Sequence, residues 1–272
     1  MYKAIFLDLD GTLLRSDLTI GKDTISALEK ATGLGMRIVL CSGRYRQGLR
    51  SCIRMLGMSV IESCINGALI CDGERTIRKV LIDKAAYREA ASYVKGRTRS
   101  GIAFTENRYA IDADDEFFDR QCIICDQEGI RMDITDPDEV ERRTVESIHK
   151  ILLKDSDSQV IQDLGAELKE RFSALPIRIL CSDLRNLEIL PEGIDKSDSV
   201  RIVSEYLGIG VDETIAFGDW DNDIGMIGAA GLGIAMGNCC SALRESADII
   251  TLSNNDDGIA YALERYVFPE MA

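Results

Sequence analysis

Residues 4–12 read AIFLDLDGT, an apolar stretch that leads into two aspartates, a glycine and a threonine. A run this short and this apolar is typical of a strand buried within a parallel sheet. Asp8 and Asp10 come where that strand is expected to end, and Gly11 suits the turn that must follow. These nine residues therefore predict a buried strand that carries two carboxylates to a loop.

Helix and strand patterns alternate outward from this stretch. Within residues 24–34, apolar side chains recur at positions 25, 28, 31 and 34, which is helical spacing, and Gly35 suits a helix C-terminus. Residues 36–41 form a second apolar run, and the turn at residues 42–44 leads into a helix that extends to about Leu56. Such strand–loop–helix repeats predict a parallel sheet with helices on both faces.

The middle of the chain has a different pattern. Short strands surround Asn66 and Gly67, a strong signal for a tight turn, and residues 82–190 then mix helices and strands in an α+β order. Beyond them the strand–helix alternation returns. We therefore expect an α/β fold in which residues 1–81 and 191–272 form a Rossmann-like parallel-sheet core and residues 82–190 form an inserted α+β domain.

The composition is that of an acidic globular protein, with 46% hydrophobic residues, 29% charged residues and a formal net charge of −14. The apolar fraction is sufficient for a packed core, which excludes disordered and fibrous classes. Because the Lys and Arg residues are scattered, we expect no nucleic-acid partner. No apolar run approaches the ~18 residues that span a bilayer, and the first strand begins too early for a signal peptide. We expect no membrane partner and a cytoplasmic location.

The numbers of histidine and cysteine residues exclude several kinds of catalytic and metal site. His149 is the only histidine, so neither a Ser-His-Asp hydrolase nor a multi-histidine metal site is expected. Cys122 and Cys125 form a C-x-x-C pair, but no second pair or nearby histidine supports zinc, and their apolar neighbours are typical of a helix interior.

Polar clusters occur where the strands of the expected core end. They comprise residues 8–12, residues 42–44, Lys196 and residues 218–223. In open parallel sheets, ligands bind beyond the carboxyl ends of the strands. Although these clusters are far apart in sequence, a parallel sheet would bring them to one edge.

The acidic residues at this edge predict a cation site. Asp8 and Asp10 would repel each other unless a cation or a proton lay between them. Mg²⁺ prefers carboxylate, carbonyl and water oxygens, and residues 218–223 (GDWDND) supply further carboxylates. Alone, residues 8–11 could be a polar turn; joined to residues 218–223, they favour a magnesium site.

The basic and hydroxyl groups at this edge allow two interpretations. Ser42 and Arg44 lie between a strand and a helix, where a hydroxyl and free backbone N–H groups could hold phosphate oxygens. Ser42 could instead be a simple helix N-cap that needs no ligand. Lys196 could balance charge on a nucleophile and a phosphate, or be an ordinary surface lysine.

Taken together, these stretches resemble the four motifs of the haloacid dehalogenase-like phosphatases, at residues 8–14 (DLDGTLL), residues 42–44 (SGR), Lys196 and residues 218–223. The chain is most similar to the Cof subfamily, which carries a large α/β cap between the second and third motifs. Connecting segments also resemble that subfamily, at residues 65–68, 188–191, 236–238 and 255–260. The resemblance covers the core nearly end to end, whereas the inserted domain matches in length and pattern more than in residues.

The resemblance implies a magnesium-dependent phosphoric monoester hydrolase. Asp8 would attack phosphorus and form an aspartyl-phosphate. Asp10 would protonate the leaving alcohol and then activate the water that hydrolyses this intermediate. In the family, Mg²⁺ would be held by the Asp8 carboxylate, the backbone carbonyl of Asp10, Asp219 and, nearby or through water, Asp223.

The same resemblance implies a set of groups around the transferring phosphoryl group. Lys196 would act as a catalytic cation, and the substrate phosphate would be bound by Ser42, Gly43, Arg44 and Asn222. Such positioning and charge neutralisation do most of the work in phosphoryl transfer.

The chain departs from the family pattern at residues 197–198 (SD) and 239–240 (CC), where the family favours small residues. Neither departure removes a catalytic group. Because the cap carries specificity in this family, the weak match of residues 82–190 leaves the substrate open. Glu106, Asn107 and Arg108, on an expected hairpin tip, could reach over the site or form a solvated turn.

The expected partner is a small phosphorylated metabolite, such as a sugar phosphate or a phosphorylated cofactor, and the expected assembly is a monomer or a homodimer. Two alternatives stay open from the sequence. One is a phosphomutase of the same superfamily, in which the aspartyl-phosphate meets a sugar hydroxyl. The other is a non-enzymatic sensor of phosphorylated ligands, although a pure binder has no need for the second carboxylate of Asp10.

Overall fold

The computed structural model describes residues 1–105, 109–112, 130–131, 136–144 and 148–270. The predicted tip residues Glu106 to Arg108, and the pair Cys122 and Cys125, lie outside these ranges. Two compact units can be distinguished. Unit 1 comprises Met1–Arg44, Leu49–Lys79 and Asp195–Ala272, and unit 2 comprises Tyr45–Gly48 and Val80–Ile194. Across the described ranges, no helix combines the length and the apolar character required to cross a membrane.

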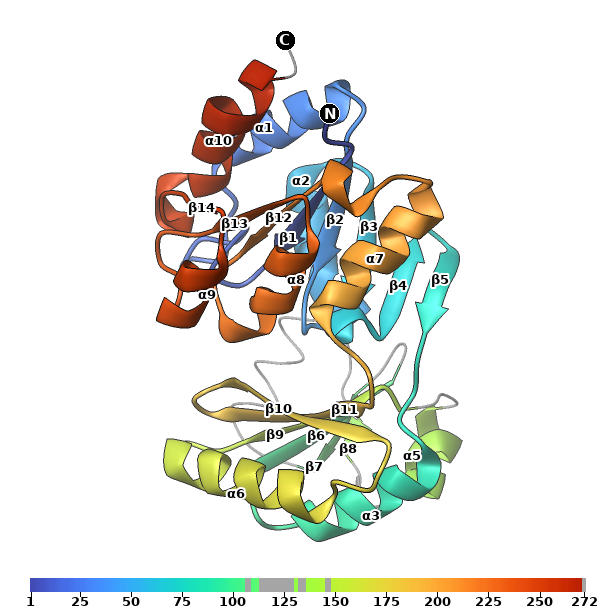
Figure 1. Ribbon diagram of the computed structural model, residues 1–272. Coiled ribbons are helices and arrows are strands. Elements are labelled where there is room, and N and C mark those ends of the chain that lie inside the picture. Colours follow the sequence, from blue (N-terminus) through green and yellow to red (C-terminus); the bar gives the residue numbers. More distant parts are fainter. Residues whose placement is uncertain (106–108, 113–129, 132–135, 145–147, 271–272) are drawn as a thin grey trace. The chain divides into compact units, whose positions relative to one another are not determined.

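Unit 1 is built on an eight-stranded sheet with the order β14-β13-β12-β1-β2-β3-β4-β5 (Figure 1). Its strands are β1 (Ala4–Asp8), β2 (Arg37–Cys41), β3 (Val60–Cys64), β4 (Leu69–Asp72), β5 (Arg75–Lys79), β12 (Thr214–Gly218), β13 (Leu232–Ala235) and β14 (Ile249–Ile250). The strands from β14 to β3 pair in parallel, and β4 and β5 extend the sheet with antiparallel pairs. The predicted parallel-sheet α/β fold is confirmed.

The register of the central strands decides where their loops emerge. Asp8 at the end of β1 is level with Cys41 of β2, and Leu7 is level with Phe217 of β12. Because these strands run in parallel, the loops that follow them leave the same edge of the sheet. Residues 9–12, 42–44 and 219–223 are therefore neighbours.

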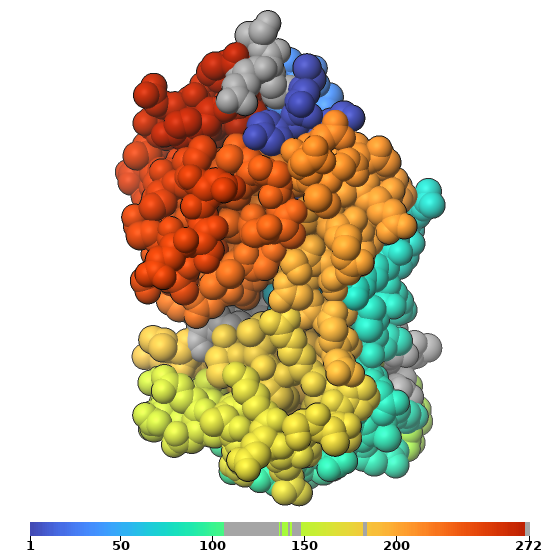
Figure 2. Space-filling model, viewed as in Figure 1, coloured from blue at the N-terminus to red at the C-terminus, as the bar shows by residue number. Residues whose placement is uncertain are grey.

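Helices cover both faces of this sheet. They are α1 (Lys22–Gly33), α2 (Arg50–Leu56), α7 (Lys196–Leu207), α8 (Ile224–Ala229), α9 (Ser241–Ser246) and α10 (Gly258–Ala262), which continues as irregular helical turns to Glu270. Alternate β1 residues, Ala4 and Phe6, share a buried cluster with Val200 and Val203 of α7 and with Met226 of α8. The helices α7 to α9 form the outer layer over this face (Figures 1 and 2). The helices α1 and α10 pack together on the other face (Figure 1).

One helix begins later than its sequence pattern predicts. The pattern places a helix directly after Arg44, but a 3-10 turn at Arg46–Leu49 comes first and α2 begins at Arg50. The carbonyl of Arg44 accepts a hydrogen bond from the backbone N–H of Ile65 (3.0 Å). This contact ties Arg44 to the connection between β3 and β4, ahead of the helical turns.

Unit 2 is a six-stranded sheet with the order β10-β11-β9-β6-β7-β8. Its strands are β6 (Ser100–Phe104), β7 (Tyr109–Asp112), β8 (Ile130–Arg131), β9 (Lys150–Lys154), β10 (Ile177–Asp183) and β11 (Asn186–Pro191), and its described helices are α3 (Lys84–Val94), α5 (Pro137–Thr144) and α6 (Ser158–Arg171). All pairs are antiparallel except β7 with β8. This mixed sheet agrees with the predicted α+β pattern.

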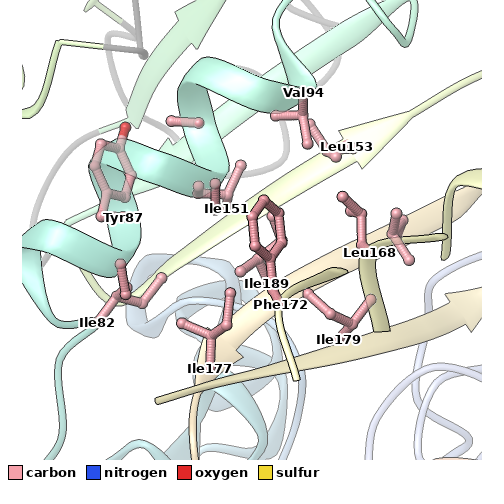
Figure 3. Close-up of a cluster of buried hydrophobic side chains, with 14 of the residues drawn as sticks. Ile82, Tyr87, Val94, Ile151, Leu153, Leu168, Phe172, Ile177, Ile179 and Ile189 are labelled. Carbon is pink, nitrogen blue, oxygen red and sulfur yellow. The ribbon is translucent and has the colours of Figure 1, made fainter. Parts of the chain in front are cut away.

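The core of unit 2 lies between one face of its sheet and its helices. Ile151 and Leu153 alternate along β9, so both point to this face, where they meet Val94 of α3 and Leu168 of α6 (Figure 3). Phe172, directly after α6, fills the centre of the same cluster (Figure 3). Unit 2 therefore has an apolar core of its own, as an independently packed unit requires.

Candidate active site

Asp8 ends β1 and is nearly inaccessible to solvent, with 6% of its surface exposed. Its position follows from the sequence, because a strand buried on both faces can only end by turning at the edge of the sheet. There the Asp8 carboxylate meets Lys196, whose Nζ lies 2.6 Å from Oδ1. A buried carboxylate needs such a partner, since an unpaired charge in the interior is strongly unfavourable.

The loop after β12 brings two further carboxylates to the same place. Oδ2 of Asp223 accepts hydrogen bonds from the backbone N–H groups of Asp219 (3.1 Å) and Trp220 (3.2 Å), which folds the loop back on itself. Gly218 allows this fold, because a Cβ there would lie 2.5 Å from the Cβ of Asp223. Oδ1 of Asp219 accepts a hydrogen bond from the hydroxyl of Thr12 (3.1 Å).

The three carboxylates of Asp8, Asp219 and Asp223 form one cluster, with an oxygen of each within 4.8 Å of the others. Burial and repulsion from Asp223 raise the pKa of Asp8 well above its ordinary value. Burial and the same neighbour raise the pKa of Asp219 to about 6. Carboxylate oxygens packed this closely are the donor set that hard divalent cations prefer, so the cluster can hold a divalent metal ion.

Among the residues that the structure describes, Lys196 supplies the one positive charge within this cluster. It is the first residue of α7, held there by Asp195, whose side chain caps the helix by accepting from the N–H of Ser197 (2.9 Å). Its Nζ bridges Asp8 and Asp223 at 2.6 Å each. Burial lowers the pKa of Lys196, but the attraction of the two carboxylates outweighs it and the net change is a rise. Three carboxylates and one ammonium leave two negative charges, which a divalent cation would balance.

Lys196 reaches the site by a different route from the one expected. The sequence pattern grouped it with residues that follow strands of the core sheet. It instead opens a helix, after a segment that follows β11 of the other sheet. The difference arises because the chain re-enters unit 1 at Asp195, so a helix N-terminus and not a strand end carries the lysine.

Asp10 lies apart from the three clustered carboxylates. Its side chain is 55% exposed, and its two oxygens accept from Arg44, with Oδ2 lying 2.8 Å from Nε and Oδ1 bonded to a terminal guanidinium nitrogen. Gly11, between Asp10 and Thr12, has φ +85, and a Cβ on it would lie 2.2 Å from Oδ2 of Asp219. A glycine is therefore required at position 11, where the loop after β1 passes the carboxylate of Asp219.

The loop after β2 contributes Ser42, Gly43 and Arg44. Ser42 is buried, and its hydroxyl oxygen accepts from the N–H of Arg44 (3.0 Å). This is a local turn contact and not a helix N-cap, because α2 begins only at Arg50. The hydroxyl proton can still be donated outward. Gly43 is half-buried, and so is Asn222, which lies in the turn Asp221–Asp223.

Two residues of the site had no role assigned from the sequence. Thr12 orients Asp219 through its hydroxyl, and Asn238 connects two loops. Nδ2 of Asn238 donates to the carbonyl of Gly11 (2.8 Å) and its Oδ1 accepts from the N–H of Asn254 (3.0 Å). Asn238 follows β13 at the same sheet edge, so the rule that located Asp8 and Asp219 also points to it.

Comparisons with known proteins identify the family of the chain. A family model described as haloacid dehalogenase-like hydrolase matches residues 5–263. A phosphatase-named protein of Haemophilus influenzae is 32% identical over 274 residues, covering 99% of this chain and 100% of the relative. A 5-amino-6-(5-phospho-D-ribitylamino)uracil phosphatase of Bacillus subtilis is 26% identical over 292 residues, covering 99% and 100%.

Solved structures give the same result. The crystal structure of a haloacid dehalogenase-like hydrolase from Bacteroides thetaiotaomicron matches with a TM-score of 0.84 at 27% identity, covering 97% of this chain and 99% of that one. The match extends over both units, so the fold is shared along nearly the whole chain. The chain therefore belongs to the haloacid dehalogenase-like hydrolases and, within them, to the Cof-like phosphatases.

Proposed function

We propose that this phosphatase hydrolyses small phosphate monoesters with Mg²⁺, through an aspartyl-phosphate formed on Asp8. The observation that carries the proposal is the buried cluster of Asp8, Asp219 and Asp223 bridged by Lys196. A nucleophile, a cation site and a fixed ammonium at one sheet edge are what phosphoryl transfer needs.

Asp8 is assigned as the nucleophile. Lys196 binds Oδ1 of Asp8, which orients the carboxylate and favours its ionised form. The other oxygen then forms a bond to phosphorus while the bond from phosphorus to the ester oxygen breaks. The product of this step is an aspartyl-phosphate and a free alcohol.

Asp10 is assigned as the acid and then the base. Its exposed side chain lies two residues beyond the nucleophile, where a leaving group and water can reach it. Asp10 gives its proton to the departing ester oxygen. It then takes a proton from the water that attacks phosphorus, which releases phosphate and restores the Asp8 carboxylate.

The metal would be held by the carboxylates of Asp8 and Asp219, the backbone carbonyl of Asp10 and, nearby or through water, Asp223. When bound, Mg²⁺ supplies the positive charge that balances the clustered carboxylates and the transferring phosphoryl group. Mg²⁺ suits an all-oxygen site that retains water.

Ser42, Gly43 and Asn222 are proposed to bind the non-bridging oxygens of the phosphoryl group together with Lys196. Ser42 supports this assignment because its buried hydroxyl lies at the same sheet edge as Asp8. The resemblance also assigns Arg44 to the phosphate, whereas its guanidinium contacts the carboxylate of Asp10 in the structure.

The substrate class is proposed to be sugar phosphates or phosphorylated cofactors and their precursors. One relative is named as a phosphatase of 5-amino-6-(5-phospho-D-ribitylamino)uracil, a phosphorylated sugar-alcohol chain joined to a heterocycle. Residues 82–190 keep their proposed role as the cap domain that selects the substrate. The phosphatase names of the relatives favour hydrolysis over the phosphomutase and sensor alternatives. The cytoplasmic location and the monomeric or homodimeric state stay predictions.

The proposal is tested by phosphate release from chelator-treated protein, with and without added Mg²⁺, on p-nitrophenyl phosphate, sugar phosphates and phosphorylated ribitylamino heterocycles. We expect turnover only with the metal, and hydroxylamine should trap Asp8 as its hydroxamate during turnover. Turnover that persists in chelator, or trapping at a residue other than Asp8, would overturn the assignment.

A further inference from the structure

We propose that Arg44 is the positioning residue of Asp10, which it holds through a two-point contact so that the carboxyl group faces the leaving group. This inference rests on the acid–base role proposed for Asp10. It gives Arg44 a different task from the phosphate binding that the sequence motif suggests.

The contact itself has the geometry of an orienting clamp. The guanidinium of Arg44 reaches both carboxylate oxygens of Asp10, with Nε 2.8 Å from Oδ2 and a terminal nitrogen on Oδ1. A two-point contact between planar groups fixes direction as well as distance. Each carboxylate oxygen has two lone-pair sites, so each oxygen retains one for a proton.

Arg44 is anchored at both ends of its backbone. Its N–H donates to the hydroxyl of Ser42 (3.0 Å), and its carbonyl accepts from Ile65 (3.0 Å). The carbonyl of Ser42 in turn accepts from the N–H of Asn66 (2.9 Å). The guanidinium therefore extends from a fixed platform, which a positioning residue requires.

The two partners differ in exposure in the way that this role demands. The Arg44 side chain is 21% exposed and that of Asp10 is 55% exposed. An acid–base group must meet substrate and water, whereas the group that orients it does best when packed. An ion pair so exposed on one side adds little to folding stability, so its geometry is better explained by function than by structure.

The leaving group distinguishes a positioning role of Arg44 from phosphate binding. An alkyl phosphate expels a strongly basic oxygen and needs the acid, whereas p-nitrophenyl phosphate expels a weakly basic one and needs it far less. If Arg44 positions the acid, its loss harms the alkyl ester selectively. If Arg44 binds the phosphate, both esters suffer alike, because they share that group.

The experiment measures kcat/KM for a sugar phosphate and for p-nitrophenyl phosphate in the wild type, Arg44→Met, Arg44→Lys and Asp10→Asn. We expect Arg44→Met to lower kcat/KM for the sugar phosphate by about 10²-fold. It should lower kcat/KM for p-nitrophenyl phosphate by less than about tenfold. Arg44→Lys keeps the positive charge but loses the two-point guanidinium contact. Its kcat/KM for the sugar phosphate should lie between those of the wild type and Arg44→Met. The ratio of the two values in one preparation does not depend on how much of the variant is folded.

Arg37→Met is the matched control. Arg37 pairs with both oxygens of Asp72 at 3.0 and 3.1 Å in unit 1, outside the proposed site, and its loss should leave the ratio unchanged. Equal losses on both esters in Arg44→Met, or no loss on either, would overturn the inference. If Asp10→Asn itself shows no leaving-group preference, the failure lies instead in the proposed acid–base role.

Discussion

Nζ of Lys196 lies 2.6 Å from Oδ1 of Asp8, and 188 positions of sequence separate the two residues. The contact closes the unit 1 core, since it joins its first strand to the first helix after the insertion. Because both charges are buried, substitutions of this pair should change the free energy of unfolding as well as turnover.

Replacing Lys196 should destabilise the fold, whereas replacing Asp8 should not. Lys196→Met leaves Asp8 and Asp223 buried without their cation, and loss of one member of a buried pair costs about 3–5 kcal/mol. Asp8→Asn removes one of the repelling carboxylates, so its free energy of unfolding should equal or exceed that of the wild type. Urea unfolding in chelator measures both, and both variants should lose turnover. A stable, active Lys196→Met would contradict the bridging role.

Metal binding should be visible without any activity assay. Trp220 is the only tryptophan, is 40% exposed, and its backbone N–H donates to Asp223. We expect Mg²⁺ to change the fluorescence of Trp220. Asp219→Asn should raise the half-saturating Mg²⁺ concentration by at least about tenfold, since a charged ligand is lost.

Asp221→Asn is the matched control for this titration, because Asp221 lies in the same loop but outside the cluster, where it accepts from the thiol of Cys240. Its titration should match that of the wild type. Equal weakening in both variants would mean that the loop's overall charge attracts the cation and that no defined site exists.

Gly11→Ala should lower Mg²⁺ affinity in addition to the stability that backbone strain costs. Gly11 has φ +85, and a Cβ there would lie 2.2 Å from Oδ2 of Asp219. Gly35 has φ +90 with nothing within 4 Å of such a Cβ, so Gly35→Ala isolates the strain, about 1–2 kcal/mol. Gly11→Ala should lose that stability and, in addition, Mg²⁺ affinity in the fluorescence titration. Retained affinity would show that the loop can move aside.

The sequence could predict which residues meet at the candidate site because many of them obey a local rule. Asp8, Ser42 and Asp219 each follow a buried strand, and parallel strands end at one edge. The same rule extends to Asn238, whose role emerged only with its contacts to Gly11 and Asn254.

Other features depend on contacts that no local pattern encodes. The pairing of Asp10 with Arg44 joins residues 34 positions apart, and it depends on the direction of two long side chains. The late start of α2 accompanies such a contact, in which the N–H of Ile65 donates to the carbonyl of Arg44. The sequence predicts a strand end of the core sheet for Lys196, because sequence spacing alone does not say which sheet the preceding strand belongs to.

The acid stability of unit 2 should depend on Glu167. Hydrogen bonds from Arg97 and then Tyr93 lower the pKa of Glu167 from its ordinary value of 4.5 to about 2. A carboxylate with a lowered pKa stabilises the fold above its unfolded pKa, and this stabilisation is lost as the pH falls from about 4.5 through about 2. Glu167→Gln should therefore flatten the fall of melting temperature with pH over that window, while Glu170→Gln, an exposed change in the same helix, serves as control. Parallel wild-type and Glu167→Gln curves would show that the contacts with Arg97 do not persist in solution, because only an interaction that distinguishes the folded from the unfolded chain makes stability depend on pH.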